Sequence, residues 1–229
     1  MVILTGIIEL FIIFTLLVLS YKFFGRTGLI FWVGFGIIIA NLQVLKAVDV
    51  LGFEATLGNI MFASLYLATD ILNEKYGRNV AKKAVWMGLF SMIAFTLISQ
   101  ITLVFTPSKS DFAHEHLEVI LGLVPRIAIA SAISYVIGNF FDVWVFNKIR
   151  TLVRADRKFY IRAIGSTSLS SIIDTALFAL IAFYGTYPNE VVLNIFITTY
   201  ILKLLTTVFN VSFGYIAKSI KPLSERQYK

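Results

Sequence analysis

Hydrophobic residues fill seven long runs of the chain, and short stretches of charged, proline and glycine residues separate the runs. In chain order, the runs cover residues 3–24, 28–47, 57–76, 80–106, 124–148, 161–185 and 190–217. About 20 consecutive apolar residues in a helix span the hydrocarbon core of a bilayer. The pattern therefore predicts an all-α fold: a polytopic membrane helix bundle of about seven transmembrane helices, joined by short loops.

Composition supports this class and excludes a soluble enzyme. Of the 229 residues, 58% are hydrophobic and 14% are charged, whereas roughly a quarter of the residues in a soluble domain are charged. The spans leave no room for a separate soluble domain, so we expect residues 1–229 to form a single transmembrane domain. The first run has no basic residues before it and lacks a small-residue cleavage site, which favours a retained helix over a cleaved signal peptide.

Lysine and arginine residues are distributed unequally between the two ends of the predicted spans. One set of ends carries sixteen of them: Lys22, Arg26, Lys75, Arg78, Lys82, Lys83, Lys148, Arg150, Arg154, Arg157, Lys158, Arg162, Lys218, Lys221, Arg226 and Lys229. The other set carries Lys46, Lys109 and Arg126, and Lys203 lies near the middle of the seventh run. Because short loops rich in basic residues stay in the cytoplasm, this distribution predicts an N-terminus outside the cell membrane and a cytoplasmic C-terminus.

The formal net charge of +7 arises at these ends. Anionic lipid headgroups are sufficient partners for it, so we expect no nucleic-acid partner. The absence of cysteine excludes disulfides, thiolate metal sites and cysteine nucleophiles. Both histidines, His114 and His116, fall in a predicted outer loop at 107–122. We interpret this segment as a solvated loop rather than a metal site, and we expect no cofactor.

Six ionisable residues fall within the predicted spans or at their ends: Glu9, Asp70, Arg126, Asp142, Asp174 and Lys203. A charge at membrane depth is costly unless it is paired or faces water, so such residues usually mark a substrate or ion pathway. Asp174 and Lys203 lie near the middle of consecutive spans. We therefore expect them to face each other as an ion pair.

Polar residues accompany these charges at helical spacing in three consecutive spans. The stripes are Ser131, Tyr135, Asn139 and Asp142; Ser166, Ser170 and Asp174; and Thr199, Lys203, Thr206 and Asn210. Residues three or four positions apart share one helix face, so each stripe is predicted to face the bundle interior. One interpretation is that the stripes only join the helices through hydrogen bonds. The other is that they line a path for a polar solute.

Sequence motifs for catalysis are absent. The chain contains no Gly-x-Ser-x-Gly, His-Glu-x-x-His, Gly-x-x-x-x-Gly-Lys-Ser/Thr or Gly-x-Gly-x-x-Gly motif. No histidine lies at membrane depth to activate a serine. An aspartyl dyad of Asp142 and Asp174 is the alternative, and Lys203 disfavours it because an ammonium group neutralises a carboxylate. We therefore predict that the protein is not an enzyme.

Two charged blocks at the ends of spans are distinctive. The first reads Thr-Asp-Ile-Leu-Asn-Glu-Lys-Tyr-Gly-Arg over residues 69–78, and the second reads Asp-Val-Trp-Val-Phe-Asn-Lys-Ile-Arg over residues 142–150. These blocks resemble the queuosine precursor transporter family, also described as vitamin-uptake-like transporters. Four further residues share in the resemblance: Arg126, Ser171, Asp174 and Lys203. It extends from about Asn41 to the C-terminus.

The resemblance implies uptake of a 7-deazaguanine, such as 7-cyano-7-deazaguanine or its aminomethyl form, to supply tRNA modification. Members of the family are usually drawn with six spans, which makes residues 1–26 an extra N-terminal helix and residues 27–229 the family core. The expected partners are the deazaguanine substrate and membrane lipids. A homo-oligomer and a separate energising module are both left open. The alternative function is the substrate-binding membrane subunit of an ATP-driven uptake system for a vitamin-like small molecule.

Recognition of such a base calls for a carboxylate at membrane depth. A deazaguanine presents an N–H and an exocyclic amine side by side, and one carboxylate accepts both hydrogen bonds. Asp142 is the favoured residue and Asp70 the next, because Asp174 is assigned to Lys203. Asparagine amides are expected at the carbonyl edge, and an aromatic ring on the base face. The predicted substrate-binding residues are Asp142, Asp70, Asn139, Asn41, Glu74, Arg126, Asp174, Lys203 and Trp144.

Overall fold

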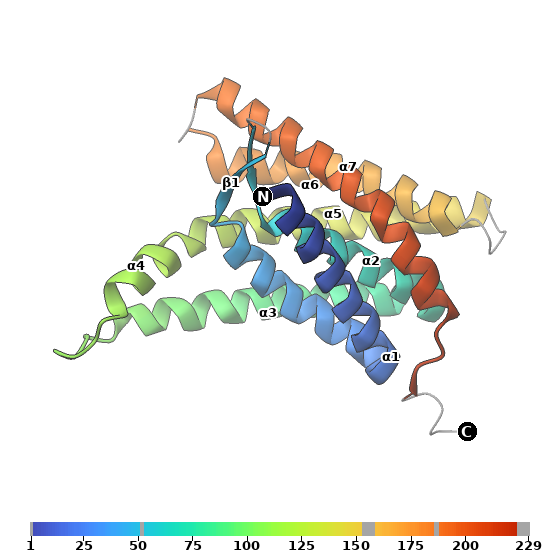
Figure 1. Cartoon of the computed structure of the whole chain (residues 1–229), viewed down its shortest axis with the longest axis horizontal. Helices are drawn as coiled ribbons and strands as arrows, with labels where there is room; N and C mark the ends of the chain where they lie inside the picture. The colour runs from blue at the N-terminus through green and yellow to red at the C-terminus, as the bar shows by residue number, and fades with distance from the viewer. Residues whose placement is uncertain (1, 51–52, 153–158, 186–187, 224–229) are drawn as a thin grey trace.

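The computed structural model describes residues 2–50, 53–152, 159–185 and 188–223, which form a helix bundle with one short β-hairpin (Figure 1). The helices are α1 (Val2–Gln43), α2 (Gly58–Tyr76), α3 (Arg78–Val104), α4 (His114–Gly122), α5 (Val124–Leu152), α6 (Phe159–Phe183) and α7 (Asn189–Ser219). The strands β1 (Ala47–Val50) and β2 (Phe53–Thr56) pair antiparallel. The predicted all-α membrane bundle is confirmed as a class, and the hairpin is a small addition to it.

The number of membrane-crossing helices differs from the sequence prediction. Among the described residues, five helical stretches are long and apolar enough to cross a bilayer: Val2–Gln43, Arg78–Val104, His114–Leu152, Tyr160–Phe183 and Asn189–Ser219. This count does not confirm the predicted number of about seven. One reason is that α1 contains two of the predicted runs. The other is that α2 carries several buried polar residues, namely Asn59, Ser64, Thr69, Asp70 and Asn73.

The first helix folds back on itself at Gly25. This glycine has φ = 57°, a left-handed conformation that residues with a side chain rarely adopt. The Gln43 amide donates a hydrogen bond to the Glu9 carboxylate at 2.6 Å, so the two ends of α1 lie beside each other. Residues 2–24 and 26–43 therefore form a helical hairpin, which corresponds to the first two predicted runs (Figure 1).

Helix α2 lies inside the bundle. It packs against α1, α3 and α7, and its apolar side chains Leu65 and Leu67 are completely buried. Other helices expose large apolar side chains, such as Phe90 on α3 and Leu193 on α7. Such surfaces are expected where helices contact lipid. The sequence thus places a comparatively polar helix where the protein, and not the lipid, surrounds it.

The two ends of the bundle are easily distinguished. The first turn of α1 lies beside β1, at what we term the β-hairpin end (Figure 1). The last turn of α7 lies at the opposite end, which we term the C-terminal end (Figure 1). These two ends give the direction along which the polar residues are described below.

The segment before α5 departs from the sequence prediction. The sequence predicts a loop over 107–122, but His114–Gly122 form α4. Asp111 accepts hydrogen bonds from the backbone N–H groups of Ala113 and His114, at 2.8 and 3.0 Å, and this stabilises the start of the helix. The loop prediction is therefore wrong for α4. His114 and His116 are two positions apart on this helix, a spacing at which side chains do not face each other.

Candidate functional site

Four helices, α2, α5, α6 and α7, bring the polar stripes together in the bundle interior. Every residue of the three predicted stripes is at least nine-tenths buried, so their inward orientation is confirmed. Helix α2 adds Asn59, Tyr66 and Asp70 to the same interior. Three groups follow one another from the β-hairpin end to the C-terminal end, and we name them the Lys203 pocket, the aspartate pair and the Glu74 cluster.

Lys203 and Asp174 form the predicted ion pair. The ammonium nitrogen of Lys203 lies 2.9 Å from Oδ1 and 3.0 Å from Oδ2 of Asp174, and it also donates to the Thr175 hydroxyl at 2.9 Å. The Tyr66 hydroxyl donates to Oδ2 of Asp174 at 2.5 Å. Gly138 permits this close packing, because a Cβ atom there would lie 2.5 Å from Cβ of Asp174. The charges are thus compensated, as a buried ion pair requires.

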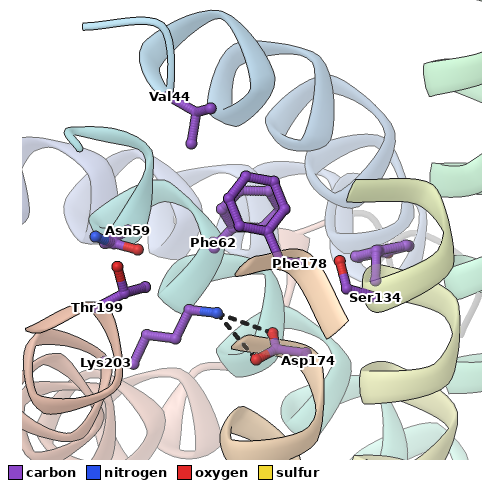
Figure 2. A pocket seen from close by; sticks show the side chains of 9 residues that line it. Val44, Asn59, Phe62, Ser134, Asp174, Phe178, Thr199 and Lys203 are labelled. Atoms are coloured by element: carbon purple, nitrogen blue, oxygen red, sulfur yellow. Dashed lines mark hydrogen bonds and ion pairs between the residues drawn. The ribbon is translucent and has the colours of Figure 1, made fainter. Parts of the chain in front are cut away.

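The Lys203 pocket opens beside this ion pair (Figure 2). Its cavity volume is about 30 Å³, which is room for about two water molecules. Its lining residues are Val44, Asn59, Phe62, Ser134, Tyr135, Asp174, Phe178, Thr199 and Lys203. Figure 2 shows the Lys203 side chain extending toward Asp174, with Asn59 and Thr199 nearby. The Lys203 ammonium nitrogen also lies 6.0 Å from the centre of the Phe62 ring.

The pocket combines groups that suit a planar polar solute. The Asp174 carboxylate accepts hydrogen bonds, and the Lys203 ammonium and the Asn59 amide donate them. Phe62 and Phe178 contribute aromatic surface. The arrangement can therefore hold a small polar ligand through hydrogen bonds and aromatic contacts.

The aspartate pair consists of Asp70 on α2 and Asp142 on α5. Both residues lie where α2 and α5 are in contact: one turn further along, the Asn147 amide on α5 donates to Oδ1 of Asn73 on α2 at 3.1 Å. Asp70 and Asp142 are only 2% and 1% exposed. The Ser170 hydroxyl donates to Oδ1 of Asp142 at 3.1 Å. The two residues that the sequence favours for base recognition are therefore neighbours, but neither is among the residues that line the Lys203 pocket.

The Glu74 cluster lies toward the C-terminal end of the bundle. One carboxylate oxygen of Glu74 binds both the Arg162 guanidinium on α6 and the Lys218 ammonium on α7, the latter at 2.9 Å. Arg150 on α5 donates to the backbone carbonyl of Asn73 at 3.1 Å and to that of Glu74 at 3.4 Å. Four helices are therefore joined at this point by charged groups.

Two of the remaining predicted residues do not line the pocket: Asn41 is buried elsewhere in the bundle, and Arg126 is exposed. The Asn41 amide donates to the Ile37 carbonyl at 2.8 Å and to the Met92 sulfur at 3.3 Å, between α1 and α3. The Arg126 guanidinium donates to the Tyr184 carbonyl just beyond α6, at 3.1 Å. Both residues thus satisfy backbone groups of their own surroundings.

Asn139 and Trp144, both on α5, also lie outside the pocket lining. The Asn139 amide donates to the Tyr135 carbonyl at 2.9 Å, and its own carbonyl oxygen has no hydrogen-bond partner among the described residues. Trp144 is 45% exposed and packs beside Phe141. The structure therefore brings Asp174 and Lys203 into the pocket and leaves Asn41, Arg126, Asn139 and Trp144 outside it.

Sequence reasoning missed five residues of the pocket: Val44, Asn59, Phe62, Ser134 and Phe178. A signal for some of them exists. Asn59, Phe62, Tyr66 and Asp70 follow one another at spacings of three or four residues along α2. The stripe rule applied to the other helices would have included α2 as well. Phe178 likewise follows Asp174 by four residues on α6.

A comparison with known families identifies the chain. Residues 56–217 match the family described as "Putative vitamin uptake transporter". The chain belongs to this family. The matched region begins in β2 and ends within α7. It includes the aspartate pair, most of the Glu74 cluster, and every residue of the Lys203 pocket except Val44. The resemblance predicted from the two charged blocks is confirmed.

Individual relatives carry related names. A "Probable queuosine precursor transporter" of Bacillus subtilis (strain 168) is 42% identical over 213 residues, which cover 93% of each chain. A "Queuosine precursor transporter" of Escherichia coli (strain K12) is 30% identical over 177 residues, 74% of this chain and 75% of that protein. A "Probable queuosine precursor transporter" of Haemophilus influenzae is 33% identical over 147 residues, 64% of this chain and 60% of that protein. No solved structure matches the chain. This member of the vitamin uptake transporter family is a multi-pass membrane protein.

Proposed function

We propose that the protein imports a queuosine precursor, a 7-deazaguanine such as 7-cyano-7-deazaguanine, across the cell membrane. The observation that carries the proposal is the Lys203 pocket, because it is a polar and aromatic site inside a transporter of this family. The names of the Bacillus subtilis and Escherichia coli relatives supply the class of substrate. Fixed polar groups within a mostly apolar pocket are what orient a small planar ligand.

The base is proposed to bind beside the ion pair. One edge of a 7-deazaguanine carries an N–H and an amine, both donors, next to a carbonyl acceptor. The Asp174 carboxylate accepts from the donors, and the Lys203 ammonium donates to the carbonyl. Phe62 and Phe178 stack on the ring faces, at about 1–3 kcal/mol per stacked base. This assignment puts Asp174 ahead of Asp142 as the recognition residue.

The protein is further proposed to have seven spans, namely the two arms of α1, then α2, α3, α4 with α5, α6 and α7. Helix α2 qualifies in spite of its polar residues, because they are buried against other helices. The distribution of lysine and arginine then puts the N-terminus outside and the C-terminus inside. Five of the sixteen basic residues that support this orientation lie outside the described residues: Arg154, Arg157, Lys158, Arg226 and Lys229. In this orientation the Lys203 pocket lies toward the outside and the Glu74 cluster toward the cytoplasm.

Single cysteines test this orientation, because the natural chain contains none. Ser110→Cys, in the connection before α4, is expected to react with a membrane-impermeant maleimide from outside the cell. Thr151→Cys, at the end of α5 and near Arg154, is expected to react only in inside-out vesicles. Reaction of both positions from the same side would contradict the seven-span arrangement.

Exchange of labelled substrate tests the transport function. Liposomes that contain the purified protein are loaded with unlabelled 7-cyano-7-deazaguanine, and entry of the labelled compound is followed. Entry is expected for the natural chain and should be suppressed by excess unlabelled deazaguanine but not by adenine, which lacks the N–H donor. Asp174→Asn is expected to abolish exchange, whereas Glu118→Gln, on the exposed surface of α4, should preserve it.

The same experiment separates the alternative function. A substrate-binding subunit of an ATP-driven system would bind the labelled base without exchanging it across the membrane. Binding without exchange by the purified protein would therefore favour that alternative. Exchange that survives in Asp174→Asn with unchanged preference over adenine would return recognition to the aspartate pair.

A further inference from the structure

The aspartate pair lacks the compensation that the other buried carboxylates have. The Lys203 pocket and the Glu74 cluster each contain a carboxylate bound to a cation. Among the described residues, no cation forms an ion pair with Asp70 or Asp142. Two adjacent buried carboxyl groups cannot both be ionised, because they repel each other and have lost their hydration. The pair must therefore hold a cation, and the smallest is a proton shared between the two groups.

Several buried oxygen atoms lie close to the pair. The Ser170 hydroxyl on α6 donates to Oδ1 of Asp142 at 3.1 Å, and Ser166 and Thr167 are buried on the same helix. Thr167 is 2% exposed, and its hydroxyl has no hydrogen-bond partner at ordinary geometry among the described residues. Oδ1 of Asp70 and Oδ2 of Asp142 also have none there. These buried oxygens form a built site that has unused capacity for a proton or another small cation.

Most of the other ionisable groups in this interior are already engaged. They are Tyr66 and Glu74 on α2, Arg162 and Asp174 on α6, and Lys203 and Lys218 on α7. The Tyr135 hydroxyl on α5 has no hydrogen-bond partner among the described residues, but a neutral phenol is not a cation. Arg162 and Lys218 bind Glu74, and Lys203 binds Asp174. No described cation is thus left over to neutralise the pair.

The pair also occupies a position between the Lys203 pocket and the Glu74 cluster. Asp70 follows Tyr66 by four residues, and Tyr66 bonds to Asp174 in the Lys203 pocket. Asp70 precedes Glu74 by four residues on the same helix. One helical turn of α2 therefore separates the pair from the substrate site on one side and from the Glu74 cluster on the other.

We propose that the aspartate pair is a proton-coupling site: it takes up one proton from outside with each substrate molecule and releases that proton to the cytoplasm. The inference rests on the proposed transport function and adds its source of energy. Protonation leaves the pair with a single negative charge at most, whereas release of the proton requires water to reach it. Coupling follows because the change from the outward-facing to the inward-facing conformation costs least free energy when substrate is bound and the aspartate pair is protonated.

The test uses liposomes with the purified protein, a pH-sensitive dye inside and the membrane potential held at zero. With the outside one pH unit more acidic, labelled 7-cyano-7-deazaguanine is expected to accumulate up to about tenfold, because one proton carries that ratio per pH unit. Substrate should also acidify the interior. Asp70→Asn and Asp142→Asn are each expected to lose accumulation and acidification but to exchange substrate within about threefold of the natural rate. Glu118→Gln is the matched control and should retain both.

Each other outcome overturns the inference. Proton-driven accumulation in both variants would show that the pair is not the coupling site. Accumulation that needs a sodium gradient would replace the proton with sodium. Loss of exchange in both correctly folded variants would assign the pair to base recognition.

A substrate-independent measurement separates this inference from the proposed function. If the natural chain does not exchange 7-cyano-7-deazaguanine, the substrate assignment fails. Infrared spectra of the purified protein still test whether the aspartate pair is protonated, because they need no substrate. A carbonyl band of a buried protonated carboxyl is expected in the natural chain and should disappear when Asp70→Asn and Asp142→Asn are combined, because a single remaining buried carboxyl would still favour its neutral form. Absence of this band from the natural chain would overturn the proton site by itself.

Discussion

The Lys203 pocket and the Glu74 cluster use the same interaction with different packing. Each centres on a buried carboxylate bound by a lysine of α7. Open space lined by aromatic rings lies beside Lys203, whereas cationic groups from α5, α6 and α7 surround Glu74 and the adjacent backbone. Space is thus left beside the ion pair of the Lys203 pocket, where the substrate is proposed to bind, and is filled at the Glu74 cluster, which we propose to act as a closure. In the proposed orientation, the pocket is on the outer side and the closure on the cytoplasmic side.

The most severe test of the comparison removes the lysine of the pocket. Lys203→Ala is expected to abolish uptake and to lower stability by about 3–5 kcal/mol, because the buried Asp174 charge then lacks its partner. Uptake into liposomes and thermal unfolding in detergent measure the two effects. Lys83→Ala, on the exposed surface of α3, is the control and should change neither measurement much.

A charge-neutral double variant separates stability from binding at the same place. Asp174→Asn combined with Lys203→Met removes both charges, so most of the stability lost in Lys203→Ala should return. Uptake should not return, because the base has lost its acceptor and its donor. Full uptake by the double variant would show that the ion pair only joins the helices, and the contrast with the Glu74 cluster would disappear.

An intermediate effect is expected from the aromatic wall of the pocket. Phe178→Ala removes a stacking surface worth about 1–3 kcal/mol, so the base should bind on the order of tenfold more weakly. Competition binding with labelled 7-cyano-7-deazaguanine measures this loss. Phe90→Ala is the matched control, because Phe90 is 72% exposed on α3 and faces the surroundings of the bundle. Equal losses in both variants would remove Phe178 from the site.

The smallest effect is expected at the closed end. Glu74→Gln removes the charge that holds Arg162 and Lys218, so the cytoplasmic end should open more often. A cysteine at the fully buried Ser166 reports this opening, since the natural chain has no cysteine. Its labelling in inside-out vesicles is expected to speed up by about fivefold in the Glu74→Gln background. An unchanged rate would show that the cluster is not what closes this end.

The ion pair of the pocket was predictable from the sequence, and the Glu74 cluster was not. Asp174 and Lys203 are opposite charges near the middle of consecutive spans, so each is the simplest partner for the other. Arg162 looks in the sequence like one more basic residue at a cytoplasmic helix end. Only the packing of α6 against α2 shows that it is buried and bound to a carboxylate 88 residues away.

The aspartate pair shows a second limit of the sequence. Asp70 and Asp142 lie at similar distances from the inner ends of their spans, so their common depth was readable. Their contact depends on how α2 and α5 are rotated about their axes, and hydrophobicity does not specify that rotation for helices with polar groups on several sides. The long hydrophobic runs predicted helices that the structure contains. The sequence did not predict α4, because its nine residues are too few to form a membrane span.

The turn at Gly25 also bears on how the chain enters the bilayer. A single residue joins the two arms of α1, so no intervening loop separates them. The hydrogen bond from Gln43 to Glu9 satisfies the carboxylate of the first arm within this unit. Helix α2 comes after the β1–β2 hairpin and packs on the two arms. We therefore expect the N-terminal hairpin to offer a protein surface in the lipid to the polar helix that carries Asp70.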